Sequence, residues 1–237
     1  MLRTICCYTF GGLYLMVTYP LLLRARYLEK NSKLKELDRF VLSFTKKLSI
    51  FLYWLTGSSV KITGLDNVPI DQPVLFVSNH QSHMDSIIIQ GYIDVPKGFV
   101  SIVEVLRFPI LRTWMKYMKC VFLDRGDIKQ MFTCIEESVK SLRQGHSMVI
   151  FPEGRFSECD TVGEFKKGCL KMAIKAGVPV VPITLKGSDK IMTKDGSRIT
   201  GAAVECIISK PIQTVGLDKE EEKKLVEVVR DIIIKNI

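Results

Sequence analysis

After Gly57 the sequence alternates between short apolar runs and longer segments with helical periodicity, and no other feature limits the possible folds as strongly. Short runs rich in Val, Ile and Phe are typical of buried strands. Segments whose apolar residues recur about every three to four positions are typical of amphipathic helices. The alternation of the two therefore predicts an α/β sandwich, in which helices cover a mostly parallel sheet.

The expected elements can be placed from these patterns. Strands are predicted at Val60–Thr63, Val74–Ser78, Phe99–Val103, Cys120–Leu123, Met148–Phe151, Val178–Leu185 and Val204–Ile208. Helices are predicted near Met84–Tyr92, Ile110–Tyr117, Ile128–Gln144 and Phe165–Ala176. Asp127 is placed to cap the third of these helices. The final helix starts at Asp218, where Glu221 completes a capping-box pattern. One domain, residues 58–237, accommodates all of them.

The first 57 residues have a different character. No residue from Ile5 to Leu23 is charged, and as a helix this run would measure about 28 Å, the lower edge of a bilayer crossing. Gly11, Gly12 and Pro20 interrupt it. In Leu34–Leu55 apolar residues recur at helical spacing, with lysines and arginines between them. The sequence of residues 1–57 therefore predicts a two-helix membrane-binding hairpin that lies in one leaflet. The alternatives are that this segment crosses the whole bilayer or that it packs on the core of the domain.

Charge distinguishes between possible anionic partners. The chain carries +9, and residues 1–60 contribute +6 of it, from nine basic and three acidic residues. Basic and apolar character in one segment favours lipid over nucleic acid, and no zinc-finger spacing or RNA-binding signature is present. The seven cysteines are scattered without a CxxC pair, which predicts reduced thiols and no metal site. His146 has no visible acidic partner and is expected in a turn.

The stretch FVSNHQSHMDSIII, residues 76–89, holds the other two histidines and an aspartate. Residues two apart on a helix do not face each other, so Asp85 is poorly placed to support His83. His80 fits if it lies in the turn before the helix and Asp85 in the first helical turns. A carboxylate there would fix the histidine tautomer and make His80 a general base. The alternative is that Asn79 or Ser82 caps the helix while both histidines are solvated.

This stretch contains the first of four motifs that follow one another along the chain. NHQSHMD (79–85) resembles the NHxxxxD motif of the glycerolphospholipid acyltransferases of the 1-acylglycerol-3-phosphate type. CVFLDR (120–125), VIFPEGRFS (149–157) and AGVPVVPITLKGS (176–188) are similar to that family's second, third and fourth motifs. FKKG (165–168) lies where the family often has a basic residue before glycine. Four motifs in order are far more specific than any one alone.

The resemblance implies an enzyme that moves a fatty acyl group from an acyl thioester to the sn-2 hydroxyl of 1-acyl-glycerol-3-phosphate, giving phosphatidic acid. It implies a His80–Asp85 pair as the general base, and backbone N–H groups near the motif turn are expected to stabilise the oxyanion. The expected partners are the phospholipid bilayer, lysophosphatidic acid and acyl-CoA or acyl carrier protein. No cofactor is expected, and the location is the cytoplasmic face of the membrane. Residues implied in substrate binding are Arg125, Glu153, Gly154, Arg155, Ser157 and Lys167.

The third motif departs from the family pattern. It usually ends EGTRS, whereas this chain has EGRFS, so that Arg155 comes one position early and Phe156 stands where the arginine is expected. The shift makes Arg155 a doubtful phosphate ligand and gives more weight to Arg125 and Lys167. It leaves other acceptors open, namely glycerol-3-phosphate, another lysophospholipid or a lyso-aminolipid. A catalytically inactive lipid-binding protein and a thioester hydrolase are the remaining alternatives.

Overall fold

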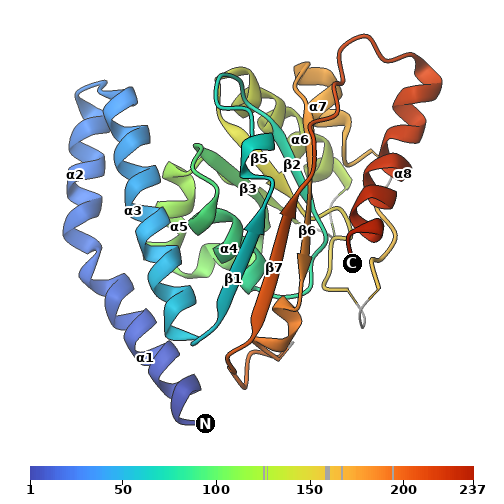
Figure 1. Cartoon of the computed structure of the whole chain (residues 1–237). Helices are drawn as coiled ribbons and strands as arrows, with labels where there is room; N and C mark the ends of the chain where they lie inside the picture. The colour runs from blue at the N-terminus through green and yellow to red at the C-terminus, as the bar shows by residue number, and fades with distance from the viewer. Residues whose placement is uncertain (125, 127, 158–160, 167, 194) are drawn as a thin grey trace.

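The strands form a single mixed sheet in the order β1-β7-β6-β2-β5-β3-β4 (Figure 1). The computed structural model describes the chain except for residues 125, 127, 158–160, 167 and 194 and the side chains of 128 and 129. The strands are β1 (Ser59–Thr63), β2 (Leu75–Ser78), β3 (Lys97–Ile102), β4 (Val121–Leu123), β5 (Ser147–Ile150), β6 (Val180–Lys186) and β7 (Ala203–Ile208). Every neighbouring pair is parallel except β6 and β7. The prediction of a mostly parallel sheet is confirmed.

Helices cover both faces of this sheet. They are α1 (Leu2–Val17), α2 (Tyr19–Lys30), α3 (Leu34–Leu55), α4 (Met84–Tyr92), α5 (Pro109–Tyr117), α6 (Ile128–Arg143), α7 (Lys171–Ala176) and α8 (Lys219–Lys235). Figure 1 shows α3 and α4 on one side of the sheet and α6, α7 and α8 on the other. The predicted α/β sandwich is therefore confirmed.

The alternation of side chains along β2 divides the core into two layers. Phe76 packs with residues of α3 and α4, whereas Leu75 and Val77 pack with residues of α6, α7 and α8. All three side chains are fully buried. A strand covered on both faces needs apolar residues at the covered positions, which is why Leu75–Val77 is an apolar run. The polar residues that begin with Ser78, the last residue of β2, therefore mark the edge of the sheet.

The first three helices lie together beside the sheet. α1 and α2 are separated at Thr18, whose hydroxyl donates to the carbonyl of Leu15 (2.6 Å), and Pro20 lies in the first turn of α2. Leu2–Lys30 is long and apolar enough to cross a membrane, and only 17% of its most apolar window is buried. α3 packs against α4 and places Tyr53 in the main core. The domain boundary at residue 57 stays a prediction.

The predicted ends of three helices can be compared with the structure. The capping box at Asp218 is confirmed, because its carboxylate accepts the N–H groups of Glu220 and Glu221. The helix expected from Phe165 is shorter: α7 begins at Lys171, after Gly168 has taken a left-handed conformation (φ 82°). The cap expected at Asp127 lies outside the described residues.

A small cavity lies where α3, α4 and β3 meet. Lys97 is buried there and donates to the carbonyls of Ile93 (2.6 Å) and Val95 (3.2 Å). His146 at the rim lies 3.2 Å from the carboxylate of Asp38 on α3, so the expectation that it has no acidic partner is wrong. The partner comes from more than 100 residues away, beyond the reach of local spacing.

The burial of Lys97 predicts a pH-dependent stability. Burial lowers the pKa of Lys97 to about 7, because desolvation penalises the ammonium form. Above that pH the unfolded chain still binds this proton and the folded chain does not, so the free energy of unfolding rises with pH. From pH 7.5 to 9 we expect the wild type to gain roughly 2 kcal/mol relative to Lys97→Met. Urea unfolding of both proteins at both pH values measures it; a constant difference between them would contradict the assignment.

Candidate active site

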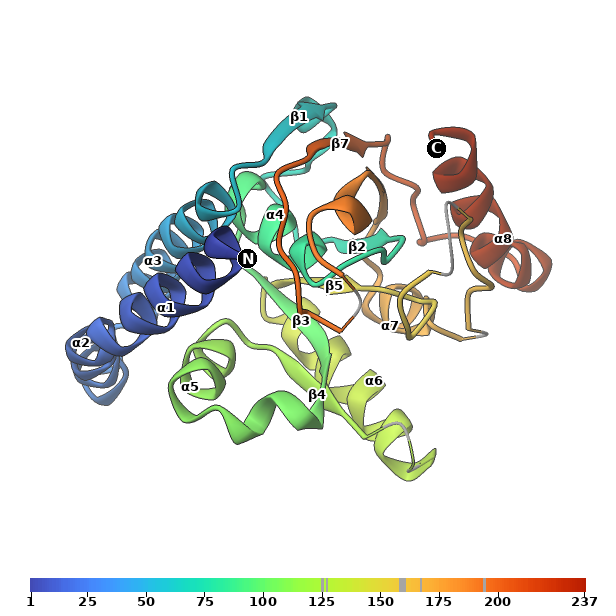
Figure 2. The ribbon, with the colours of Figure 1, turned by 90° about the horizontal axis from the view of Figure 1, so that it is seen from below.

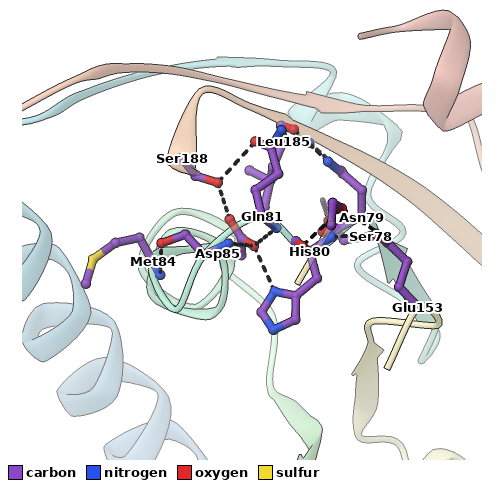
Figure 3. A network of polar contacts seen from close by, with 11 residues as sticks. Ser78, Asn79, His80, Gln81, Met84, Asp85, Glu153, Leu185 and Ser188 are labelled. Carbon is purple, nitrogen blue, oxygen red and sulfur yellow. Dashed lines mark hydrogen bonds and ion pairs between the residues drawn. The ribbon is translucent and has the colours of Figure 1, made fainter. Parts of the chain in front are cut away.

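The site begins where β2 ends, at the centre of the sheet. Asn79 follows β2 and bonds to β6 with both ends of its amide: Nδ2 donates to the carbonyl of Leu185, and Oδ1 accepts its N–H, each at 2.8 Å. The side chain thus continues the pairing of β2 with β6 after the strand has stopped. This pairing fixes the start of the loop and directs the next residue, His80, out of the sheet edge (Figure 3).

His80 and Asp85 lie in contact. Nδ1 of His80 is 2.8 Å from Oδ2 of Asp85, and the histidine lies in the turn before α4 while the aspartate lies in its first turn. A carboxylate can only accept, so Nδ1 carries the proton and Nε2 keeps its lone pair. Figure 3 shows the Nε2 edge of the ring directed away from Asp85. The geometry expected for a supported base is present, and the alternative of two solvated histidines is wrong for His80.

Asp85 is fully buried, and its charge is stabilised on both oxygens. Oδ2 also accepts the backbone N–H groups of Gln81 (2.7 Å) and Ser82 (2.8 Å), and Oδ1 accepts the hydroxyl of Ser188. The position in the first turn of α4 adds the favourable field of the helix N-terminus. Four hydrogen bonds hold this carboxylate in one place, which is what a buried charge requires.

Two phenyl rings flank the imidazole of His80. The ring of Phe151 stacks on it at 4.0 Å between centroids, and the ring of Phe156 meets it edge-on at 4.5 Å. Phe156 also meets His83 edge-on at 4.7 Å. The residue that replaces the family's arginine therefore forms an apolar wall beside the histidine. The two phenyl rings give the imidazole of His80 an apolar environment.

Glu153 joins three loops behind the histidine. Oε1 accepts the N–H of His80 (2.9 Å), while Oε2 accepts the hydroxyl of Ser157 (2.8 Å) and the N–H of Gly163 (2.9 Å). Ser157 in turn donates its own N–H to the carbonyl of His80 at 2.7 Å. The side chains of Glu153 and Ser157 are thus engaged with the backbone of the histidine loop, and their role in binding substrate stays a prediction.

Four substrate-binding candidates remain, and the structure describes two of them, Gly154 and Arg155. Gly154 has φ 70°, and a Cβ there would lie 2.8 Å from the Nζ of Lys166, so a basic side chain covers this glycine. Arg155 is exposed. Arg125 and Lys167 lie outside the described residues, so their predicted role in phosphate binding stays open.

Spacing did not reveal every residue of the site. The N–H groups of His80, Gln81 and Ser82 all donate to carboxylates, so these three cannot stabilise an oxyanion as expected. Ser188 and Phe151 had no assigned role, although both lie within segments that carry the motif resemblance. The only signal for Ser188 in the sequence is its position directly after Gly187 at the end of a strand.

Removing the charge of Glu153 is expected to lower the free energy of unfolding. In Glu153→Gln one amide NH₂ must face a backbone N–H, either that of His80 or that of Gly163, and that donor loses its partner. An unpaired buried donor costs roughly 1–3 kcal/mol, so we expect the melting temperature to fall by about 2–12 °C in a chain of this length. Thermal unfolding of the variant beside Glu164→Gln, an unburied neighbour, tests this. Equal melting temperatures would show that Glu153 does not hold the loops.

Comparisons with known proteins show which family has a similar sequence and fold. Residues 59–186 match the family model described as Acyltransferase. A probable 1-acyl-sn-glycerol-3-phosphate acyltransferase of Mycoplasma pneumoniae is 31% identical over 189 residues, covering 75% of this chain and 70% of the relative. The enzyme of that name from Borreliella burgdorferi is 29% identical, covering 78% and 74%. The crystal structure of the 1-acyl-sn-glycerophosphate acyltransferase of Thermotoga maritima matches with TM-score 0.86 and 28% identity, covering 99% of this chain and 93% of that one.

The fold and the site define an α/β enzyme of the acyltransferase class, with a buried carboxylate beside a histidine at the edge of the sheet. Within that class, the chain belongs to the 1-acyl-sn-glycerol-3-phosphate acyltransferase family. The resemblance found in the four motifs is confirmed.

Proposed function

We propose that this enzyme transfers a fatty acyl group from acyl-CoA or acyl carrier protein to the sn-2 hydroxyl of 1-acyl-glycerol-3-phosphate, giving phosphatidic acid. The observation that carries the proposal is the 2.8 Å contact of His80 Nδ1 with Asp85, which leaves Nε2 as a proton acceptor. The names of the relatives from Mycoplasma pneumoniae and Borreliella burgdorferi support the acceptor.

The proposed reaction needs one proton carrier. Nε2 of His80 takes the proton of the lipid hydroxyl while the oxygen attacks the thioester carbonyl. The tetrahedral intermediate then collapses, the carbon–sulfur bond breaks, and the imidazolium returns the proton to the thiolate. A thiol has a reference pKa of about 8.5, so it leaves without a strong acid. Asp85 stabilises the imidazolium between the two proton transfers.

We infer further that the enzyme works at a membrane, on the cytoplasmic face. α1 exposes a row of large apolar side chains to solvent, and these are Leu2, Ile5, Phe10, Leu13, Met16 and Val17. Burial of such a row in lipid stabilises attachment by about 25 cal/mol per Å² of apolar surface. The described cysteines are unpaired, which fits a reducing compartment. Sedimentation with anionic liposomes, with and without residues 1–30, tests the attachment.

Product analysis separates the proposal from its alternatives. The purified enzyme receives acyl-CoA and acyl carrier protein donors of different chain length, with lysophosphatidate, glycerol-3-phosphate, lysophosphatidylcholine and a lyso-aminolipid as competing acceptors. Phosphatidic acid as the main product in mass spectra supports the proposal, and the acyl mass identifies the donor. Preference for an acceptor without the phosphomonoester would favour another lysophospholipid or a lyso-aminolipid as the acceptor, an alternative that the altered third motif leaves open. Free fatty acid formed without an acceptor would indicate a hydrolase. The absence of any product would indicate a lipid-binding protein.

A further inference from the structure

The loop between β6 and β7, residues 187–202, connects the candidate base pair with the first helix. It begins with Gly187, whose φ is 86° and whose absent Cβ would lie 2.9 Å from the carbonyl oxygen of Ala203. A side chain at Gly187 would push the two loop ends apart, so the glycine allows the sharp turn that brings the next residue inward. That residue is Ser188, which is fully buried.

One end of this loop touches Asp85. The hydroxyl of Ser188 donates to Oδ1 of Asp85, and it also lies 3.3 Å from Oε1 of Gln81. A hydroxyl has a single proton, and the ionised carboxylate is the stronger acceptor, so the proton points at Asp85. The two backbone N–H donors of the His80 turn hold Oδ2, and Ser188 is the donor to the other oxygen (Figure 3).

The other end of the loop is held by α1. Thr4 accepts the N–H of Ile199 at 2.9 Å, and the hydroxyl of Tyr8 donates to the carbonyl of Gly196 at 2.7 Å. Ile199 is buried in the same core cluster as Cys7 of α1. Figure 2 shows the start of α1 close to this part of the molecule, on the face seen from below. α1 therefore contacts the loop through both hydrogen bonds and apolar packing.

Hydrogen bonds connect the two ends of this loop. Thr200 donates its N–H to the carbonyl of Ile191 (2.8 Å) and its hydroxyl to the carbonyl of Lys190 (2.6 Å). Ile191 is fully buried and lies three residues from Ser188. These hydrogen bonds and the buried Ile191 connect Ile199 with Ser188 through the described residues of the loop, so we expect a shift at Ile199 to reach Ser188.

We propose that Ser188 is a positioning residue for Asp85, and that α1 contributes to the catalytic geometry through the loop that carries Ser188. The inference rests on the proposed role of Asp85 in supporting His80. It extends that role, because the helix proposed to lie at the membrane then also sets the orientation of the carboxylate. Ser188 acts on the rate through Asp85 and touches no substrate.

The first test removes the hydroxyl. Ser188→Ala is assayed with oleoyl-lysophosphatidate and palmitoyl-CoA in mixed micelles, and its fold is checked by circular dichroism. We expect kcat to fall about tenfold with KM unchanged, because a misplaced base affects the transition state more than substrate binding. The matched control is Ser141→Ala on α6, a buried hydroxyl without a hydrogen-bond partner in the described part of the chain. Wild-type kcat in Ser188→Ala, or a rise in KM alone, would overturn the proposal.

The second test asks whether α1 acts through Ser188. Thr4→Val combined with Tyr8→Phe removes both hydrogen bonds from α1, and we expect kcat to fall about threefold in the wild-type background and not further in Ser188→Ala. Tyr19→Phe, an exposed tyrosine of α2, is the control. Equal losses in both backgrounds would overturn the link. If His80→Ala keeps wild-type turnover, the proposed function fails. If His80→Ala is inactive and Ser188→Ala keeps the wild-type kcat, only this inference fails.

Discussion

Replacing His80 by alanine is expected to lower acyl transfer by at least about 100-fold and up to roughly 10⁴-fold, the range that general acid–base catalysis contributes. The lipid hydroxyl is a poor nucleophile while it keeps its proton. In the described part of the site, the only histidine nitrogen with a lone pair directed outward and a carboxylate behind its ring is Nε2 of His80. The measurement is kcat/KM for lysophosphatidate with acyl-CoA in mixed micelles.

The matched control for this prediction is His83→Gln, which changes the neighbouring histidine of the same loop. His83 is exposed, and Asp85 Oδ2 points at His80 instead. We expect this variant to keep activity within about threefold of the wild type, since no proton transfer depends on it. Liposome binding should be equal for both variants because neither touches α1. A His80→Ala protein that turns over at the wild-type rate, or a His83→Gln protein that is inactive, would reverse the assignment.

The parts of the fold that could be predicted are those fixed by local sequence. The central strands β2, β5 and β6 are mostly apolar, and the capping box at Asp218 uses residues three apart, so each is visible within a short window. Strand order is not visible in this way. β7 runs antiparallel to β6, and the 16 residues of the connection 187–202 are enough for either direction of return. Nothing in β7 itself signals this direction.

The same distinction applies to the site. His80 and Asp85 could be paired because a single turn and the first helical turn hold both of them. The contacts that support them connect segments 73 and 103 positions apart, from Glu153 and from Ser188. Such distances are set by the sheet, which brings the ends of β2, β5 and β6 together. The motif resemblance implies a substrate-binding role for Glu153, and only the structure shows both of its oxygens engaged with other parts of the chain.

Asp85→Asn is expected to lower kcat by roughly 10- to 100-fold, because it removes the charge opposite the imidazolium while leaving the ring in place. Asparagine can direct its oxygen at the Oδ2 position, where it accepts from His80, Gln81 and Ser82. Its NH₂ then faces the hydroxyl of Ser188, which can turn and accept. The tautomer of His80 is thus preserved, and the variant isolates the electrostatic part of the Asp85 contribution.

Asp85→Ala removes the orientation as well, and it should therefore lose more activity than Asp85→Asn. It also leaves the two buried N–H groups of Gln81 and Ser82 without a partner, so its melting temperature should fall below that of Asp85→Asn. Measuring kcat and melting for both variants separates orientation from charge. Equal activity in the two variants would mean that Asp85 acts by its charge alone. An Asp85→Asn protein as active as the wild type would mean that the imidazolium needs no carboxylate, and the His80–Asp85 pair would then serve only to hold the loop before α4.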